Sequence, residues 1–173
     1  MDRKRFGREG FTLVELLVVM GIIALLAGLV LPALLHAKRV AYRASCASNL
    51  RGVGFAFRMY LQEHNDIMPV AASMPSLQLN DDPRIADVLS SYLESEKGLR
   101  CPGDDQGYFE AEGSSYQYVT ILGGQRVERT FLSRKWGEER TPVMFDYEPF
   151  HGDPGEPGAA NYLFADGHVG DLE

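Results

Sequence analysis

The stretch that decides the fold is FTLVELLVVMGIIALLAGLVLPALL, residues 11–35. From Leu16 to Leu35 it runs for twenty consecutive residues without a charge. A helix of that length spans about 30 Å, which matches the hydrocarbon core of a bilayer. The sequence therefore predicts a transmembrane helix over residues 11–35.

Charged residues flank this stretch on both sides, with a basic segment before it and His36, Lys38 and Arg39 after it. The chain has a net charge of −7, and because residues 1–10 contribute +2, residues 11–173 carry −9. Under the positive-inside bias, the basic segment that precedes the stretch should stay in the cytoplasm. We therefore expect a single-pass inner-membrane protein whose C-terminal body is periplasmic or extracellular.

The acidic body excludes some function classes. Nucleic-acid binding needs clustered Lys and Arg to contact phosphates, so the charge argues against nucleic acid as a partner of the body. No H-E-x-x-H, G-x-S-x-G or P-loop motif occurs in the sequence, and we do not expect an enzyme. The apolar fraction of 45% is sufficient for a packed core.

Two residues inside the apolar stretch are informative. Glu15 places a carboxylate near its start, and a charge in a membrane span costs roughly 2.5–3.5 kcal/mol at the helix centre and less near the interface. Pro32 removes one backbone hydrogen bond and can kink a helix. For Pro32, a tolerated membrane proline is an equally good explanation. A plain membrane anchor is the alternative for the whole stretch, but it gives no reason for Glu15.

The segment Gly10-Phe-Thr-Leu-Val-Glu15, with its short basic leader, resembles the processing site of type IV prepilins and type II secretion pseudopilins. The resemblance implies that a prepilin peptidase cuts between Gly10 and Phe11 and then methylates the new amine of Phe11. Glu15 becomes the fifth residue of the mature chain and Pro32 the twenty-second, as in the family. We expect both to serve filament assembly, with Glu15 pairing with the terminal amine of a neighbouring subunit.

The helix should continue beyond the membrane to about Glu63. Apolar and small residues recur there at steps of mostly three or four: Val40, Ala44, Ala47, Leu50, Val53, Phe57, Tyr60 and Leu61. The predicted fold is α+β and pilin-like, with a long N-terminal helix, transmembrane in its first half, packed on a small antiparallel β-sheet. The chain then divides into a cleaved leader (1–10), a transmembrane half-helix (11–35), and the amphipathic half-helix with a globular head (36–173).

The head should contain a short helix and about four strands. Apolar spacing predicts a helix over residues 83–93, with Asp82 as its N-cap. The predicted strand segments are 115–122, 126–132, 142–147 and 161–169. Gly123-Gly124 would form the turn that pairs the first two, and Asp166-Gly167 would form a turn within the last.

The two cysteines are Cys46 and Cys101. From the helical pattern alone, Cys46 is explained as a small buried residue. Three segments resemble elements of a subgroup of pseudopilin-like proteins: Cys46-Ala-Ser-Asn-Leu50, Gly98-Leu-Arg-Cys-Pro-Gly103 and Asn161-Tyr-Leu-Phe-Ala-Asp-Gly-His-Val169. This resemblance implies a Cys46–Cys101 disulfide. Fourteen residues lie between His151 and Asp166, where the subgroup usually has nine, so a shared role for His151 does not carry over.

Ionisable side chains crowd the last 28 residues of the chain. They are Asp146, His151, Asp153, Glu156, Asp166, His168 and Asp171. Carboxylates suit Ca²⁺, and the major pseudopilins that the chain resembles often bind calcium in a C-terminal loop. The candidate ligands are Asp153, Glu156, Asp166 and Asp171, although no EF-hand spacing is present. The alternative is a set of solvated loop acids and no cofactor.

The expected function is a structural subunit of a type II secretion pseudopilus. Its partners would be copies of itself or related subunits in the filament, the prepilin peptidase, the inner-membrane assembly platform and membrane lipid. Two alternatives remain. One is a type IV pilus pilin for adhesion, motility or DNA uptake, and the other is a membrane-tethered binding protein that merely uses the pilin leader.

Overall fold

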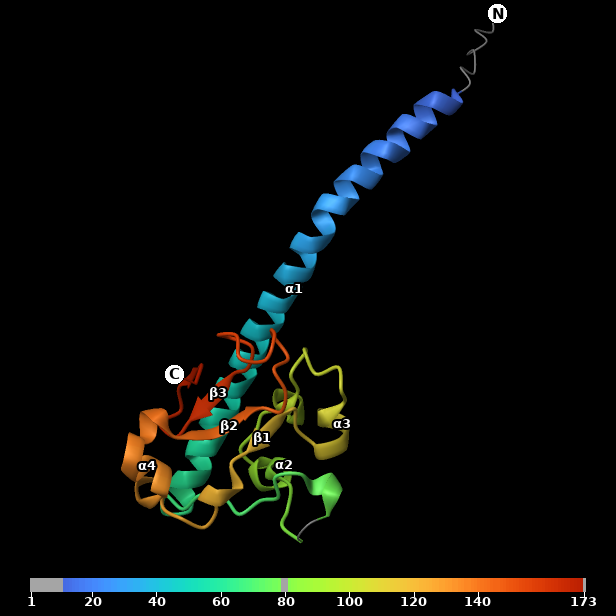
Figure 1. Ribbon diagram of the computed structural model, residues 1–173. Coiled ribbons are helices and arrows are strands. Elements are labelled where there is room, and N and C mark those ends of the chain that lie inside the picture. The colour runs from blue at the N-terminus through green and yellow to red at the C-terminus, as the bar shows by residue number, and fades with distance from the viewer. Residues whose placement is uncertain (1–10, 79–80, 173) are drawn as a thin grey trace, which may run out of the picture. The chain divides into compact units, whose positions relative to one another are not determined.

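The computed structural model describes residues 11–78 and 81–172 (Figure 1). The predicted leader, including Gly10, lies outside the described residues. The chain divides into two compact units, Met1–Lys38 and Arg39–Glu173. Helix α1 spans Leu13–Glu63 and contributes to both units.

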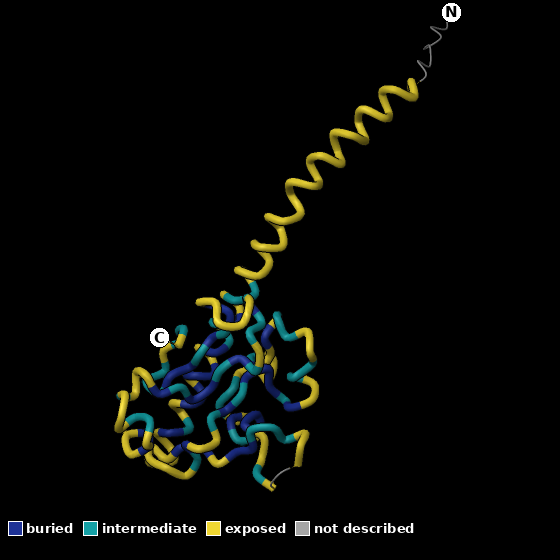
Figure 2. Tube along the Cα trace, in the orientation of Figure 1, coloured by how far each residue is buried: buried dark blue, intermediate teal, exposed yellow. Residues whose placement is uncertain are grey.

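In the first unit, the described residues form the beginning of α1. The helix starts at Leu13, two residues later than predicted, and Pro32 lies inside it without interrupting it. Every residue from 11 to 38 is exposed (Figure 2). By length and composition α1 can cross a membrane, the one helix among the described residues that can. An apolar helix with no buried face needs lipid or other helices around it.

In the second unit, the rest of α1 buries one stripe of side chains. Its buried residues are Cys46, Leu50, Val53, Gly54, Ala56, Phe57 and Leu61. The helix ends at Glu63, as predicted, because Asn65 and Asp66 adopt positive φ angles of 55° and 59°. The backbone N–H of Asp66 then donates to the carbonyl of Leu61 at 2.9 Å, which satisfies one of the terminal carbonyls.

Short helices and 3-10 turns are interspersed with irregular chain in the rest of the head. The α-helices are α2 (Ile85–Leu89), α3 (Tyr108–Glu112) and α4 (Phe131–Trp136). The 3-10 turns are η1 (Pro75–Leu77), η2 (Glu96–Leu99), η3 (Thr120–Leu122), η4 (Val127–Arg129) and η5 (Glu138–Arg140). The predicted helix over 83–93 is therefore shorter, and its N-cap is Arg84 rather than Asp82.

In the described part of the chain, four strands form one antiparallel sheet in the order β1-β2-β3-β4. They are β1 (Tyr116–Tyr118), β2 (Pro142–Asp146), β3 (Tyr162–Phe164) and β4 (Val169–Gly170). The predicted Asp166-Gly167 turn joins β3 and β4. Gly167 has a φ of +89°, and its N–H donates to the carbonyl of Phe164 at 2.8 Å. The α+β pilin-like fold is confirmed.

The predicted strand over residues 126–132 is wrong. This segment forms η4 and the first turn of α4, and β1 pairs with β2 instead. The reason is local: the hydroxyl of Thr130 accepts from the N–H of Ser133 at 3.1 Å, which caps a helix start. A strand would also need one buried face, yet Phe131 is exposed.

The core lies between α1 and the sheet. Tyr116 and Tyr118 of β1 are buried, and the Tyr118 hydroxyl donates to the carbonyl of Pro69 at 2.8 Å. The ring of Phe57 packs against Tyr118 with 6.1 Å between centroids. The head therefore closes over the apolar stripe of α1, as the helical periodicity requires.

Candidate functional site

Two of the predicted processing and assembly residues, Phe11 and Glu15, lie at the start of α1. Phe11 is exposed, and Thr12 precedes the helix. The Glu15 carboxylate accepts from the Thr12 N–H at 2.8 Å and from its hydroxyl at 2.7 Å, while the Glu15 N–H donates to that hydroxyl at 3.2 Å. This reciprocal pattern is a capping box. It holds a carboxylate at the end of the helix where the macrodipole favours negative charge.

The second site is a disulfide between Cys46 on α1 and Cys101, which follows η2. The two Cα atoms lie 5.0 Å apart, and both residues are fully buried. The bond links positions 55 residues apart in sequence and so ties the loop region to α1. Asn49, one turn along the helix, adds to this attachment by donating to the carbonyl of Arg100 at 2.8 Å.

A buried histidine and a buried aspartate adjoin the disulfide. The Nε2 atom of His151 lies 3.5 Å from the Cys101 sulfur and 3.4 Å from Oδ2 of Asp146. Both side chains are entirely shielded from solvent. Oδ2 of Asp146 also accepts two hydrogen bonds from Asn161, one from its backbone N–H at 2.7 Å and one from its side chain at 3.1 Å. The remaining atoms of the pair, Asp146 Oδ1 and His151 Nδ1, have no hydrogen-bond partner.

Sequence reasoning named Asp146 only as a member of a crowded C-terminal segment, and named His151 also as a histidine whose spacing to Asp166 departs from the pseudopilin-like subgroup. It did not connect either residue with the cysteines, because Cys101 and His151 are 50 residues apart. Among residues 11–78 and 81–172, one group of three His, Cys, Asp or Glu side chains has ligand atoms within 4.8 Å of one another. That group is Cys46, Cys101 and His151.

The four predicted calcium ligands are not brought together. Asp171 forms an ion pair with Arg43 at 2.6 Å, and Asp166 accepts from the N–H of His168 at 3.0 Å and contacts its ring Nδ1 at 2.7 Å. The Asp166 contact gives the carboxylate a turn-forming role. Its partial burial raises the pKa, but the hydrogen bonds from His168 outweigh this and lower the pKa of Asp166 overall.

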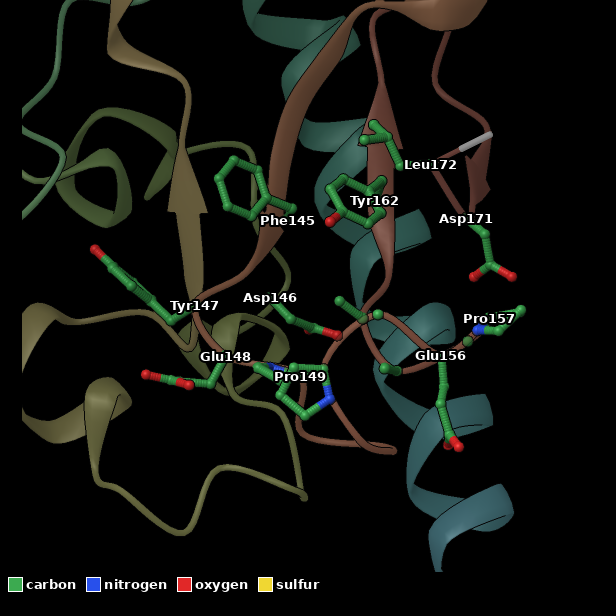
Figure 3. A pocket seen from close by; sticks show the side chains of 15 residues that line it. Phe145, Asp146, Tyr147, Glu148, Pro149, Glu156, Pro157, Tyr162, Asp171 and Leu172 are labelled. Atoms are coloured by element: carbon green, nitrogen blue, oxygen red, sulfur yellow. The ribbon is translucent and has the colours of Figure 1, made fainter.

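The other two predicted ligands, Asp153 and Glu156, lie in an exposed turn between β2 and β3. Glu156 and Asp171 both line a cavity of about 680 Å³, shown in Figure 3. The rings of Phe145 and Tyr162, from neighbouring strands, stack at its wall with centroids 5.5 Å apart. The cavity is thus lined by aromatic rings and by carboxylates from separate segments.

Asp104 organises the loop that follows Cys101. Its carboxylate accepts from the N–H groups of Gly107 (2.9 Å), Tyr108 (3.1 Å) and Phe109 (2.9 Å) at the start of α3. It also accepts from the Ser115 hydroxyl at 2.7 Å. Partial burial raises the pKa of Asp104, but the hydrogen bonds from Ser115 and the three N–H groups outweigh it, and the net effect lowers this pKa.

Comparison with known proteins agrees with these features. Residues 5–31 match the family described as the prokaryotic N-terminal methylation motif. The chain is 33% identical over 93 residues to the type IV wide pilus major component PilA4 of Thermus thermophilus, a match that covers 54% of this chain and 70% of that protein. No solved structure matches the chain significantly. The methylation motif, the long apolar helix on a small antiparallel sheet and this relative together show that the chain belongs to the type IV pilin-like family.

Proposed function

We propose that this chain is a filament subunit that is cut between Gly10 and Phe11, N-methylated at Phe11 and assembled from the inner membrane. The observation that carries the proposal is the described part of the first unit: a helix exposed on all sides, without a charge from Leu16 to Leu35, and with the Glu15 carboxylate at its capped start. In lipid such a helix is a stable anchor. Outside lipid its surface can be buried only by equivalent helices, which the neighbouring subunits of a filament supply.

Glu15 gives this assembly a register. After cleavage the new amine of Phe11 is positively charged, and both it and the carboxylate are costly in lipid unless they are paired. Within one chain the capping box already binds the carboxylate to Thr12. A carboxylate accepts more than two hydrogen bonds, so the amine of an adjacent subunit can add to these contacts without breaking the cap.

A surface fibre of the type IV pilus kind is the first form we propose, because the matching relative is a wide pilus component. A type II secretion pseudopilus is the second. It is favoured by the two cysteine segments and the Asn161–Val169 segment, which resemble a pseudopilin-like subgroup. In both forms the partners are other subunits, the prepilin peptidase and an inner-membrane assembly platform, and the head lies on the far side of the membrane from the cytoplasm.

The decisive experiment is intact-mass analysis and N-terminal sequencing of the protein from its native membrane. A chain beginning at N-methylated Phe11 supports the proposal. A chain that retains residues 1–10 would contradict the proposal and would indicate a membrane-anchored domain instead of a filament subunit.

Assembly is tested with Glu15→Val, which should be cleaved normally yet recovered in the membrane rather than in sheared filaments. Thr12→Val, which removes only the capping hydroxyl, is the matched control and should still assemble. Filament length in electron micrographs separates a surface fibre from a short pseudopilus.

A further inference from the structure

The buried group beside the disulfide contains more polar atoms than a disulfide needs. Asp146 Oδ1 and His151 Nδ1 are buried without partners, although leaving such atoms unpaired costs about 1–3 kcal/mol each. A disulfide packs well against apolar side chains, so it gives no reason for a fully buried imidazole and carboxylate at its edge. Unsatisfied buried groups of this kind are explained by a bound water, a bound ion, strain or a redox role, and the ligand distances around His151 favour the ion.

The separations around His151 are those of ligands on one metal ion. With Zn–S near 2.3 Å and Zn–N near 2.05 Å, a sulfur and a nitrogen ligand of a tetrahedral zinc lie about 3.5 Å apart, and a nitrogen and an oxygen ligand lie about 3.3–3.5 Å apart. The observed distances from Nε2 are 3.5 Å to the Cys101 sulfur and 3.4 Å to Oδ2 of Asp146. The sulfur–nitrogen edge of a tetrahedron is therefore already present, and the Asp146 carboxylate lies beside the nitrogen with its Oδ1 atom unpartnered.

We propose that, when the disulfide is reduced, Cys46, Cys101 and His151 bind one zinc ion, with the Asp146 carboxylate as the fourth ligand. Thiolate and imidazole ligands select a borderline-soft cation such as Zn²⁺, whereas calcium prefers oxygen ligands. The unpartnered Oδ1 of Asp146 is available to the ion, while Asn161 holds Oδ2 in place. Hydrogen-bonded support of a ligating carboxylate is usual in metal sites.

The two states are related by a two-electron reduction followed by metal binding. A dithiol or phosphine reductant gives two electrons to the Cys46–Cys101 bond and is itself oxidised, and each sulfur takes up one proton. The ion then displaces both thiol protons to solvent. His151 binds through Nε2 as a neutral ring with its proton on Nδ1. The sulfurs must separate from bonding distance to the distance between two ligands, which rotation of the two side chains about Cα–Cβ provides.

The consequence is that Cys46 and Cys101 link the same two segments of the chain in either redox state, by a different bond in each. In an oxidising compartment the loop after η2 is joined to α1 by a covalent bond. In a reducing environment that holds zinc, the same two sulfurs keep the loop and the helix joined through the ion.

The test uses the full-length chain in detergent micelles, reduced with a phosphine and freed of metal. Titration with Co²⁺, followed by visible absorption, should show one ion per chain with tetrahedral d–d bands and a thiolate charge-transfer band. Zn²⁺ should remove these bands and raise the melting temperature of the reduced chain. The oxidised chain should show no bands. Absence of the charge-transfer band in the reduced, folded chain overturns the proposal.

Variants assign the ligands. His151→Gln and Cys101→Ser should each weaken Co²⁺ binding at least 100-fold, and Asp146→Asn by about 10–100-fold. The matched control is His168→Gln, which alters an exposed histidine near the same end of the chain and should bind as the parent does. Equal affinity of His151→Gln and His168→Gln for Co²⁺ would show that the two thiolates bind metal without His151. That result would refute the proposed site. If a variant fails to fold, the titration of the parent chain still decides.

Discussion

Gly54 of α1 faces Leu163 of β3 so closely that a Cβ at position 54 would lie 2.9 Å from Leu163 Cδ1. Leu163 is buried in the core, so its side chain would have to shift against its neighbours to admit the added atom. The helix and the sheet therefore meet at a position where a methyl group does not fit.

Substitution of Gly54 by Ala should lower the free energy of unfolding by about 1–3 kcal/mol, because overpacking a closed core costs that much. Gly52→Ala is the matched control. Gly52 lies in the same helix, a methyl group added there would have nothing within 4 Å, and the change should stabilise by about 0.5–1 kcal/mol. Denaturant melts of the full-length chain in detergent measure both. Equal effects would show that the Gly54–Leu163 contact is not made.

Removal of the disulfide should destabilise the head. A loop between positions 55 residues apart is long enough that losing its cross-link costs about 2–4 kcal/mol. Cys46→Ser and the double variant with Cys101→Ser should melt alike in metal-free buffer, because the bond is lost in both. A single variant as stable as the oxidised parent would mean that the bond does not form. Non-reducing electrophoresis verifies the redox state.

Asp104→Asn should cost about 1–3 kcal/mol near neutral pH, because an amide nitrogen replaces one of the two oxygens that accept from α3 and Ser115. The pKa of Asp104 is lowered in the folded chain. Its stabilising effect is therefore complete above the unfolded pKa of about 3.9 and is lost as the pH falls through the folded pKa. The gap between parent and variant should close in acid, and thermal melts from pH 7 to pH 2 follow it. A constant gap would contradict the assignment.

Addition of millimolar CaCl₂ should leave the melting temperature of the head unchanged, because Asp166 and Asp171 are engaged by His168 and Arg43 and the four candidate acids are not gathered. Melts in MgCl₂ at the same ionic strength control for screening. A rise specific to calcium would show that Asp153 and Glu156 recruit the other two carboxylates when the ion binds.

The sequence predicts best those parts of the fold in which one hydrophobic pattern continues over many residues. The twenty uncharged residues and the three-to-four spacing up to Leu61 predict α1 and its end at Glu63, and Asp166-Gly167 predicts the last hairpin. Short segments carry too little pattern. In residues 126–132 the Thr130 side chain caps the start of a helix. Strand propensity does not include this local hydrogen bond, so the segment was predicted as a strand.

The buried group formed by the Cys46–Cys101 disulfide, His151 and Asp146 was predictable only in part. The pairing of the two cysteines was implied by family resemblance, whereas the approach of His151 and Asp146 depends on how β2 and its following loop return to α1. No spacing in the sequence encodes a contact made across 50 residues. Calcium ligands were chosen because acids crowd the end of the chain, but crowding in sequence does not ensure a common site in space.

The covalent link between Cys46 and Cys101 also sets how the molecule responds to tension. A stretched chain gains about 3.3–3.6 Å for every residue released from its fold. By joining positions 55 residues apart, the bond withholds roughly 180–200 Å of contour length. A pull entering along α1 passes through the sulfurs from Cys46 to Cys101, and the segment between the two cysteines, which contains η1, α2 and η2, remains outside the path of the force.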